Sequence, residues 1–404
     1  MYRLKGVAQY VVSIIGIGTG IDMMTNKASE KIQKAQILIG ASRIIDLCND
    51  NFDCSKKEIF KEYDFEKIKE ITANYKDCEI AILVSGDTGF YSLADSLFDG
   101  LSDCEVIPGI SSVNSFFSKL KMSWQDAALI SVHGRNNNIV DTVRRNKKTF
   151  VLTGNNIGDI ADRLINAGYD DLPIFVGSNL DSKNEYIEKL KTSELKNKSF
   201  DKLTVILIVN ENADSSVRIG ISDDEFIRAD VPMTKAEVRA NIISKLNIKP
   251  SDICYDIGAG TGSVTVEMAL SAWEGYVVAI EKNPDGIGLI NSNLKKFHIG
   301  NTRVICDEAT EALSYPDIPI ADVAFIGGSD GHLKEIISIL FSKNPNIKIV
   351  VSAIALETLQ IAMESFKECG YETEITQISV AKNRGVSGLN LMMANNPVYI
   401  IKGI

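Results

Sequence analysis

The sequence is poor in the residues that bind metals and form disulfides. Its 404 residues include three histidines (His133, His298 and His332) and seven cysteines, and no two cysteines form a C-x-x-C pair. Because the cysteines are odd in number and scattered, neither a disulfide framework nor a zinc site is expected. Reduced thiols are the expected state, which predicts a cytoplasmic protein with no bound metal.

Long apolar runs and excess positive charge are also lacking. No uninterrupted apolar run reaches the length of a membrane span, and residues 1–12 lack the basic start and cleavage site of a signal peptide. The formal net charge is -10, whereas a general nucleic-acid binder usually presents a basic face. Neither membrane nor nucleic acid is therefore an expected partner, although a local basic pocket for an acidic small molecule is compatible with this charge.

The length and the order of apolar segments indicate an α/β protein of more than one domain. A chain of 404 residues suits two or three domains. Short buried strands alternate with helical segments in both halves, which favours mostly parallel sheets. A polar and acidic stretch near the middle is typical of a linker. The predicted organisation is a domain over 11–210, a linker over 211–230 and a second domain over 231–404.

The strongest motif is the stretch 254–265, which reads as a buried strand, a glycine turn and the start of a helix. Its glycines, Gly258, Gly260 and Gly262, are spaced G-x-G-x-G, with Ala259 and Thr261 between them. Such a turn brings backbone N–H groups and a helix N-terminus to a ligand. Glu281 ends the next apolar run, about 20 residues on, where a ribose-binding carboxylate belongs. The spacing differs from the dinucleotide fingerprint G-x-G-x-x-G, so a dinucleotide is disfavoured but open, as is a plain glycine-rich turn.

Two further patterns flank this motif. Thr234 and Glu237 have the spacing of a capping box and predict a helix from there to about Leu246. Near the end of the chain, 373–380 and 397–401 alternate like strands. They predict an antiparallel hairpin with a Gly/Asn-rich loop over 383–396.

The first half carries its own glycine-rich strand ends. A G-x-G-x-G loop, Gly16 to Gly20, follows an apolar strand, and the segments 85–91 and 107–112 follow later ones. Loops at the carboxyl ends of strands in open α/β sheets carry function. Together with 124–126 and 131–135, these segments make the first half resemble the tetrapyrrole (corrin/porphyrin) methylases, in particular the precorrin C-5 methyltransferase branch.

That resemblance implies a two-subdomain tetrapyrrole methylase fold with the cofactor in a cleft between subdomains. Thr19 and Thr88 stand where the family usually has proline. Gly18 would border the substrate, and His133 and Arg135 are candidates for its carboxylates, although a structural histidine is an equal alternative for His133. The implied cofactor contacts are Gly86, Asp87, Thr88, Ser111 and Ser112.

The second half looks like the precorrin C-15 methyltransferases that also decarboxylate, with a class I Rossmann-like fold. The matching segments are 233–235, 256–262, 325–329 and 396–398. Gly328 and Ser329 would lie beside the substrate. Arg384 could pair with a substrate carboxylate or be a surface arginine. Glu308 stands where a shorter Asp is usual, so its adenine contact is uncertain. The implied cofactor contacts are Thr234, Gly258, Ala259, Gly260, Thr261, Gly262, Glu281, Glu308 and Ala309.

The resemblance covers nearly the whole chain and implies a bifunctional enzyme of corrin ring synthesis. S-adenosylmethionine would be the methyl donor at two sites per chain, and a precorrin or cobalt-precorrin the substrate. Carbons 5 and 15 would be methylated and the ring-C acetate decarboxylated. No nucleophilic residue or general acid or base is assigned, and association of copies into a homo-oligomer is expected. The alternatives are an RNA or protein methyltransferase and a non-catalytic cofactor-binding fusion.

Overall fold

The computed structural model describes residues 11–101, 103–132, 138–154, 156–386 and 388–403. The described chain divides into two compact units, neither of which is continuous in the sequence. The first comprises the described residues of 1–135, 148–157 and 173–209, and the second those of 136–147, 158–172 and 210–404. Over the described residues, no helix is both long and apolar enough to cross a membrane.

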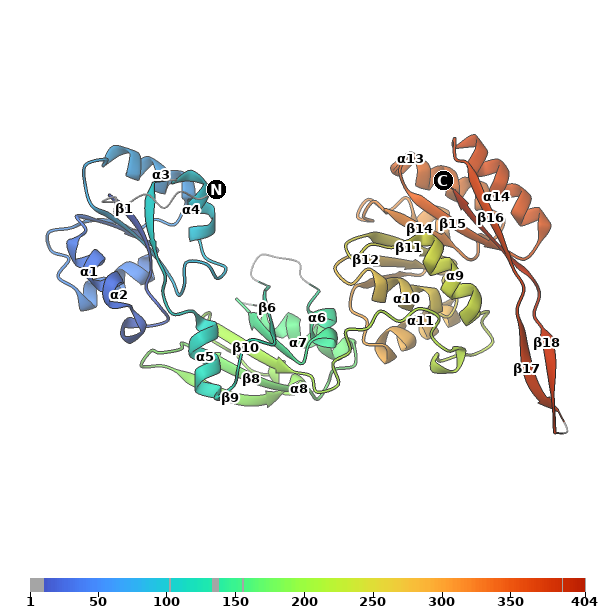
Figure 1. The fold of residues 1–404 in the computed structure, drawn as a ribbon, viewed down its shortest axis with the longest axis horizontal. Helices are drawn as coiled ribbons and strands as arrows, with labels where there is room; N and C mark the ends of the chain where they lie inside the picture. Colours follow the sequence, from blue (N-terminus) through green and yellow to red (C-terminus); the bar gives the residue numbers. More distant parts are fainter. Residues whose placement is uncertain (1–10, 102, 133–137, 155, 387, 404) are drawn as a thin grey trace. The chain divides into compact units, whose positions relative to one another are not determined.

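The first unit begins with a five-stranded parallel sheet in the order β3-β2-β4-β1-β5. Its central strands are fully buried because helices cover both faces (Figure 1). The elements are β1 Val12–Gly16, α1 Asn26–Lys34, β2 Ile37–Gly40, α2 Ser42–Asn51, β3 Glu58–Phe60, α3 Phe65–Asn74, β4 Ile80–Val84, α4 Ala94–Gly100 and β5 Cys104–Ile107.

A second sheet completes this unit, in the order β6-β7-β10-β8-β9. Only β6 and β7 pair in parallel, whereas β10 pairs antiparallel with both β7 and β8. The prediction of a mostly parallel sheet is therefore wrong here, because the alternation of strands with helical segments does not determine how the strands pair. The elements are α5 Ser112–Leu120, β6 Ala127–Ser131, β7 Lys148–Leu152, β8 Pro173–Ser178, β9 Tyr186–Lys191, α8 Thr192–Leu195 and β10 Thr204–Val209.

The second unit is built on a seven-stranded sheet in the order β13-β12-β11-β14-β15-β19-β16. Its first five strands are parallel, and β19 pairs antiparallel with both β15 and β16, so the predicted antiparallel pairing of the late strands is confirmed. The strands are β11 Ile253–Ile257, β12 Tyr276–Ile280, β13 Thr302–Ile305, β14 Val323–Ile326, β15 Lys348–Ala353, β16 Thr373–Ile378 and β19 Val398–Gly403.

Helices cover both faces of this sheet and bury two separate apolar cores (Figure 1). One core lies under α9 Ala236–Leu246, α10 Ser263–Ser271 and α11 Pro284–Lys296. The other lies under α12 Ala309–Ala312, α13 Leu333–Lys343 and α14 Leu356–Glu368. Alternate side chains of the strands enter opposite cores, as the two-residue period of a strand requires.

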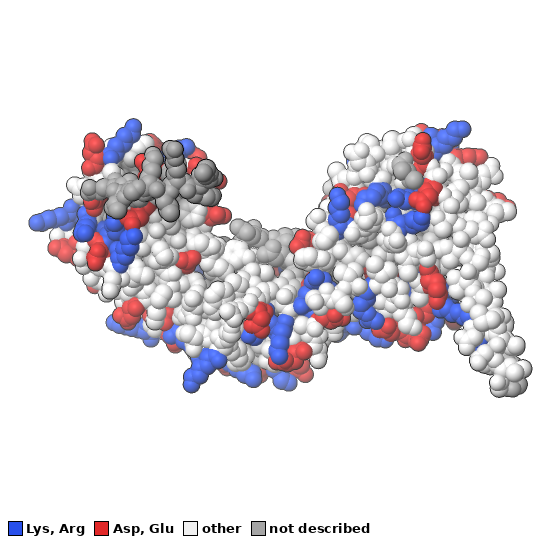
Figure 2. All heavy atoms as spheres, viewed as in Figure 1, with Lys and Arg blue, Asp and Glu red and all other residues white. Residues whose placement is uncertain are grey.

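A hairpin extends from this unit where a loop was predicted. Residues 381–394 form β17 Ala381–Val386 and β18 Leu389–Ala394, which pair with each other and with no strand of the large sheet. The loop prediction over 383–396 is therefore wrong for most of its length. Its Gly and Asn residues suggested a loop, yet the register pairs Asn383 with Met392 and Gly385 with Asn390. The outer part of the hairpin shows no charged side chain on the face seen in Figure 2.

Two helices from the first half of the sequence, α6 Ile139–Arg145 and α7 Ile157–Asn166, lie largely in the second unit. The Tyr169 ring, just after α7, stacks on His298 with 4.1 Å between ring centroids, and Asn138 donates a hydrogen bond to the Trp273 carbonyl. These contacts are distant in sequence, so no local pattern could indicate them. The domain boundaries given above remain a prediction.

Candidate functional site

Three strand ends meet at the glycine-rich loop of the second unit. In the register of the sheet, Ile257 of β11 lies between Ile280 of β12 and Ile326 of β14. The residues that follow these three strands therefore emerge at the same level, at the carboxyl edge where open α/β sheets bind ligands. They are Gly258, Glu281 and Gly327.

The loop can follow its path because its key residues are glycines. Gly258, Gly260 and Gly262 have φ of +71°, +58° and +76°, in the left-handed region that side chains disfavour. The approach is close as well, since a Cβ on Gly258 would lie 2.6 Å from the Gly328 backbone nitrogen. The loop then enters α10, whose first N–H groups and positive dipole end favour an electron-rich ligand.

Glu281 is held against this loop by its carboxylate. One oxygen accepts a hydrogen bond of 2.8 Å from the Gly260 N–H, and the other accepts one of 2.9 Å from the Asn283 N–H. A carboxylate has about four lone-pair positions, so each oxygen keeps acceptor capacity. Glu281 can therefore brace the loop and still accept the hydroxyls of a ribose.

Thr234 lies in a segment without regular structure, just before α9. The capping-box prediction is wrong, because α9 begins at Ala236 with Lys235 as its N-cap and no side chain caps it. The Ala236 N–H is instead satisfied by Asp223, whose carboxylate accepts it at 3.0 Å. Thr234 does not cap this helix and instead lines a cavity.

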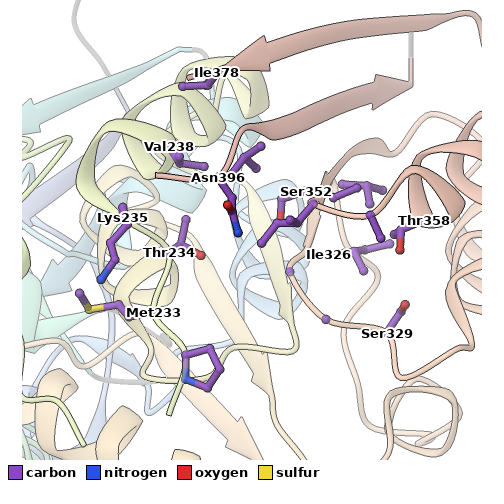
Figure 3. Close-up of a pocket in the computed structure, with 18 of the residues that line it drawn as sticks. Met233, Thr234, Lys235, Val238, Ile326, Ser329, Ser352, Thr358, Ile378 and Asn396 are labelled. Carbon is purple, nitrogen blue, oxygen red and sulfur yellow. The ribbon is translucent and has the colours of Figure 1, made fainter. Parts of the chain in front are cut away.

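That cavity, of about 660 Å³, lies along the carboxyl edge of β14 and β15. Its walls come from stretches far apart in sequence: Thr234 precedes α9, Ser329 follows β14 and Asn396 precedes β19 (Figure 3). The volume is in the range of small-molecule sites, and the lining is largely apolar with a few polar groups, as such sites require. The polar and charged lining residues are Thr234, Lys235, Ser329, Asp330, Ser352, Thr358, Asn395 and Asn396.

Two buried polar atoms on the loop have no partner among the described residues. They are Oδ1 of Asp256, at the end of β11, and Oγ1 of Thr261, within the loop. The other Asp256 oxygen accepts a hydrogen bond from the Thr265 hydroxyl. Burial raises the pKa of Asp256 to about 7, although the hydrogen bond from Thr265 works in the opposite direction.

These features fit S-adenosylmethionine. The loop leads into the N-terminus of α10, and Glu281 offers acceptors for ribose hydroxyls. The same residues would hold the corresponding homocysteine product.

Three more residues predicted to contact cofactor or substrate are Glu308, Ala309 and Arg384. Glu308 precedes α12, of which Ala309 is the first residue, and its carboxylate lies 3.3 Å from Lys282 Nζ. Arg384 lies on β17, opposite Leu391, and is not among the residues that line the cavity. Glu308 is thus at the predicted edge, whereas Arg384 is on the hairpin.

Several lining residues were not singled out from the sequence. Ser352 and Thr358 belong to the end of β15 and the first turn of α14. Lys235 and Asn396 fell within matched segments without being assigned a role. The sequence could have indicated them only by their position near the carboxyl end of β15, because such strand ends carry function in parallel sheets.

In the first unit, three glycines from three strand ends make backbone contact. A Cβ on Gly109, after β5, would lie 2.1 Å from the carbonyl oxygen of Gly86, after β4. A Cβ on Gly16, at the end of β1, would lie 2.6 Å from the Gly109 nitrogen. Gly18 and Gly86 also exchange backbone hydrogen bonds of 3.0 and 3.1 Å. The predicted Gly18 and Gly86 thus belong to one cluster of loops.

The other predicted residues of this unit lie in the same loops or just beyond them. Asp87 accepts a hydrogen bond of 2.8 Å from the Gly89 N–H, and Thr88 is buried. Ser111 caps α5, and Ser112 is its first residue. His133 and Arg135 lie outside the described residues.

Asp181 ties the first glycine loop to the second sheet of this unit and was not predicted. It accepts hydrogen bonds from Thr19 and Ser115 and lies 2.9 Å from Lys119 Nζ. Its backbone oxygen would lie 2.4 Å from a Cβ on Gly20. Asp181 therefore fixes the position of the loop within the unit, and its close approach to Gly20 leaves no space for a side chain at that position.

Comparisons with known proteins match the two halves of the chain to two different families. The family described as tetrapyrrole (corrin/porphyrin) methylases matches residues 11–196. The family described as precorrin methyltransferase domain matches residues 225–402.

Individual relatives each match a little under half of the chain. A protein of Sulfurisphaera tokodaii, named a probable cobalt-precorrin-6B C(15)-methyltransferase (decarboxylating), is 40% identical over 190 residues, which are 46% of this chain and 96% of that protein. One of the same name from Sulfolobus acidocaldarius is 38% identical over 187 residues, 46% of this chain and 96% of its own. A crystal structure titled precorrin-6y C5,15-methyltransferase, from Geobacter metallireducens, is 40% identical, covers 46% of this chain and 96% of its own, and has a TM-score of 0.43.

Proposed function

The chain belongs to the precorrin methyltransferase family, and on that premise we propose that it is the bifunctional, decarboxylating enzyme that methylates carbons 5 and 15 of a precorrin. It is an S-adenosylmethionine-dependent C-methyltransferase of cobalamin biosynthesis. Residues 11–210 would carry the methylation at carbon 5, and residues 231–404 the methylation at carbon 15 and the decarboxylation.

One observation supports this proposal above the others. In the second unit Gly258 of the glycine loop approaches the backbone of Gly328, which lines the cavity of about 660 Å³, and Glu281 is bound to the same loop. A donor held on the loop would thus lie next to a space for a substrate. We propose Thr234, Gly258–Gly262, Glu281, Glu308 and Ala309 as cofactor contacts, and Gly328 and Ser329 as substrate contacts.

A second cofactor site is proposed in the first unit, which would make two sites per chain. The support is the cluster of strand-end loops around Gly86 and Gly109, which carries Asp87, Thr88, Ser111 and Ser112. Gly18 lies in the same cluster and would border the substrate. His133, Arg135 and Arg384 remain proposals for substrate carboxylates.

The chemistry asks the protein chiefly to position its ligands. When bound, S-adenosylmethionine supplies an electrophilic methyl group. The conjugated ring of the substrate supplies the nucleophilic carbon, so no side chain needs to be a nucleophile. The glycine loop and Glu281 fix the donor, while the cavity fixes the ring carbon and excludes water, and such positioning can account for much of the rate.

Decarboxylation also depends on the substrate's own electrons. The bond between the acetate methylene and its carboxyl carbon breaks, carbon dioxide leaves, and the electron pair passes into a protonated ring imine. The apolar residues Ile326, Val351 and Val398 line the cavity and would desolvate a carboxylate placed there. Desolvation disfavours the charged carboxylate relative to the neutral product, which promotes its loss.

We further propose that copies of the chain associate in the cytoplasm. The support is the β17–β18 hairpin, whose side chains Leu389, Leu391, Met392 and Met393 are all exposed. An isolated two-stranded hairpin is marginally stable in water, and a contiguous exposed apolar surface marks an interaction site. The seven free cysteines agree with a reducing compartment.

The test is product identification with the purified chain and S-adenosylmethionine. Metal-free and cobalt-loaded precursors are supplied in parallel, and the masses of the products are measured by mass spectrometry. We expect one precursor to gain two methyl groups and lose one carbon dioxide, and the preferred precursor defines the substrate. Methylation without loss of carbon dioxide from either precursor would overturn the decarboxylating assignment.

A further inference from the structure

An irregular segment, residues 228–233, crosses the glycine loop of the second unit. The carbonyl oxygen of Pro232 lies 2.9 Å from the position of a Cβ on Gly260, and Pro232 and Met233 line the cavity. Within the described part of the chain, no hydrogen bond ties the backbone of 228–233 to any other residue. The position of this segment must therefore be set at its two ends.

Asn293 fixes the first end. This side chain on α11 is fully buried, and its amide oxygen accepts a hydrogen bond of 2.8 Å from the Ile227 N–H. Its nitrogen donates to the Ile227 carbonyl at 3.0 Å and to the Thr261 carbonyl at 2.9 Å. One amide thereby joins the start of the segment to the glycine loop and uses both of its N–H donors.

Arg239 fixes the second end. Its fully buried guanidinium donates through Nη1 to the Thr234 carbonyl at 2.6 Å and through Nη2 to the Ile221 carbonyl. It pairs with Glu267 on α10, which also accepts the Gly220 and Ile221 N–H groups at 2.9 and 3.0 Å.

A buried ion pair is weak evidence for stability, because the cost of desolvating both charges offsets their attraction. The pair does connect the end of the segment to the helix that begins at the glycine loop. Asn293 and Arg239 thus both connect the segment to the glycine loop. Asn293 does so through Thr261, and Arg239 does so through α10, which follows the loop.

We propose that Asn293 and Arg239 are positioning residues that hold 228–234 over the cofactor bound at the glycine loop. Neither side chain touches the cofactor itself. They act through the segment, which covers the loop and supplies Thr234 to the site. This inference rests on the proposed function, because it requires a cofactor at this loop.

The test compares two buried asparagines of the same unit. Asn293→Ala removes an anchor of the segment. Asn301→Ala is the matched control, because Asn301 is also buried and donates to the Ala269 and Ala272 carbonyls at 3.2 and 2.8 Å, away from the segment. Calorimetric titration with S-adenosylhomocysteine then measures affinity, and Glu281→Ala identifies the binding event that belongs to this unit.

We expect Asn293→Ala to bind at least about tenfold more weakly than Asn301→Ala at this site, as the loss of hydrogen bonds worth about 1.4 kcal/mol implies. Equal affinities would overturn the inference while leaving the proposed function intact. No binding by the wild-type chain at this site would overturn both.

Proteolysis gives a second readout that does not depend on activity. Arg228 is exposed and lies in the segment, so trypsin can cut after it. Bound S-adenosylhomocysteine should slow this cut in the wild-type chain by tenfold or more. Should Asn293→Ala fail to fold, Arg239→Lys keeps a positive charge beside Glu267 but loses the bond to Thr234, and it should show faster cutting. Cutting at the wild-type rate in Arg239→Lys, or no protection in the wild type, would contradict the inference.

Discussion

The carboxylate of Glu281 accepts a 2.8 Å hydrogen bond from the backbone N–H of Gly260, so the acid that follows β12 is bound to the loop that follows β11. Its other oxygen accepts the Asn283 N–H. One side chain therefore shapes the loop, and we propose that it also binds the cofactor ribose.

Replacing Glu281 by Ala should disable the second unit selectively. The N–H groups of Gly260 and Asn283 lose their hydrogen-bond acceptor, and the ribose hydroxyls lose the carboxylate proposed to bind them. Cofactor affinity at this site should therefore fall at least about tenfold. Decarboxylation should be abolished, while methylation at carbon 5 stays measurable by mass spectrometry of the product. If both activities fell equally, the two halves would not act independently.

Gly260→Ala should weaken cofactor binding by bending the loop. The residue has φ of +58° and its new Cβ would lie 2.9 Å from the Pro232 oxygen, so strain of about 1 to 2 kcal/mol is expected. Gly288→Ala is the control, because Gly288 is exposed within α11 with no heavy atom near its Cβ position. That control should raise the melting temperature slightly, since Ala is the better helix former. Unchanged affinity in Gly260→Ala would contradict a ligand at this loop.

Gly109→Ala should affect the first unit in the same selective way. A Cβ there would lie 2.1 Å from the Gly86 oxygen, which forces the strand-end loops apart. Calorimetry should then show loss of one of the two S-adenosylhomocysteine sites, with the other unchanged. Gly158→Ala, where a Cβ meets no heavy atom within 4 Å, should retain both sites. Retention of both sites in Gly109→Ala would argue against a cofactor in this cluster.

The buried Asp256 should make stability depend on pH. Burial raises its pKa to about 7, above the value of 3.8 for an unperturbed aspartate. The folded chain therefore holds this proton more tightly than the unfolded chain does. Its contribution to stability is greatest at low pH and declines as the pH rises from about 4 through about 7.

The Asp256→Asn variant has no proton to lose at this position. Its thermal midpoint relative to that of the wild type should therefore rise between pH 5 and pH 8, measured by calorimetric scans across that range. A constant difference between the two proteins would show that Asp256 does not titrate there.

The sequence allowed the loop and its acid to be predicted because both depend on local rules. A strand, three spaced glycines and an acid at the next strand end determine which groups emerge together at a sheet edge. The antiparallel pairing of β16 with β19 was also predicted, from two alternating stretches close together near the end of the chain. Such features require no knowledge of distant contacts.

What could not be predicted depends on residues far apart in sequence. Asn293 binds Ile227 and Thr261, 66 and 32 positions away, and its own surroundings read as an ordinary polar helix position. The T-x-x-E spacing at Thr234 was misleading because Asp223 supplies the acceptor for Ala236. Residues 383–396 were predicted as a loop because they are rich in Gly and Asn. Among the described residues, β17 and β18 pair with each other and not with the large sheet, so the pattern of the large sheet gave no indication of them.

The most direct test of the central claim is the number of cofactor sites per chain. Titration of the purified chain with S-adenosylhomocysteine in a calorimeter measures this number without any substrate. We predict two sites, one of which disappears in Glu281→Ala and the other in Gly109→Ala. A single site that Glu281→Ala abolishes would contradict the bifunctional assignment, and no site at all would contradict the methyltransferase assignment.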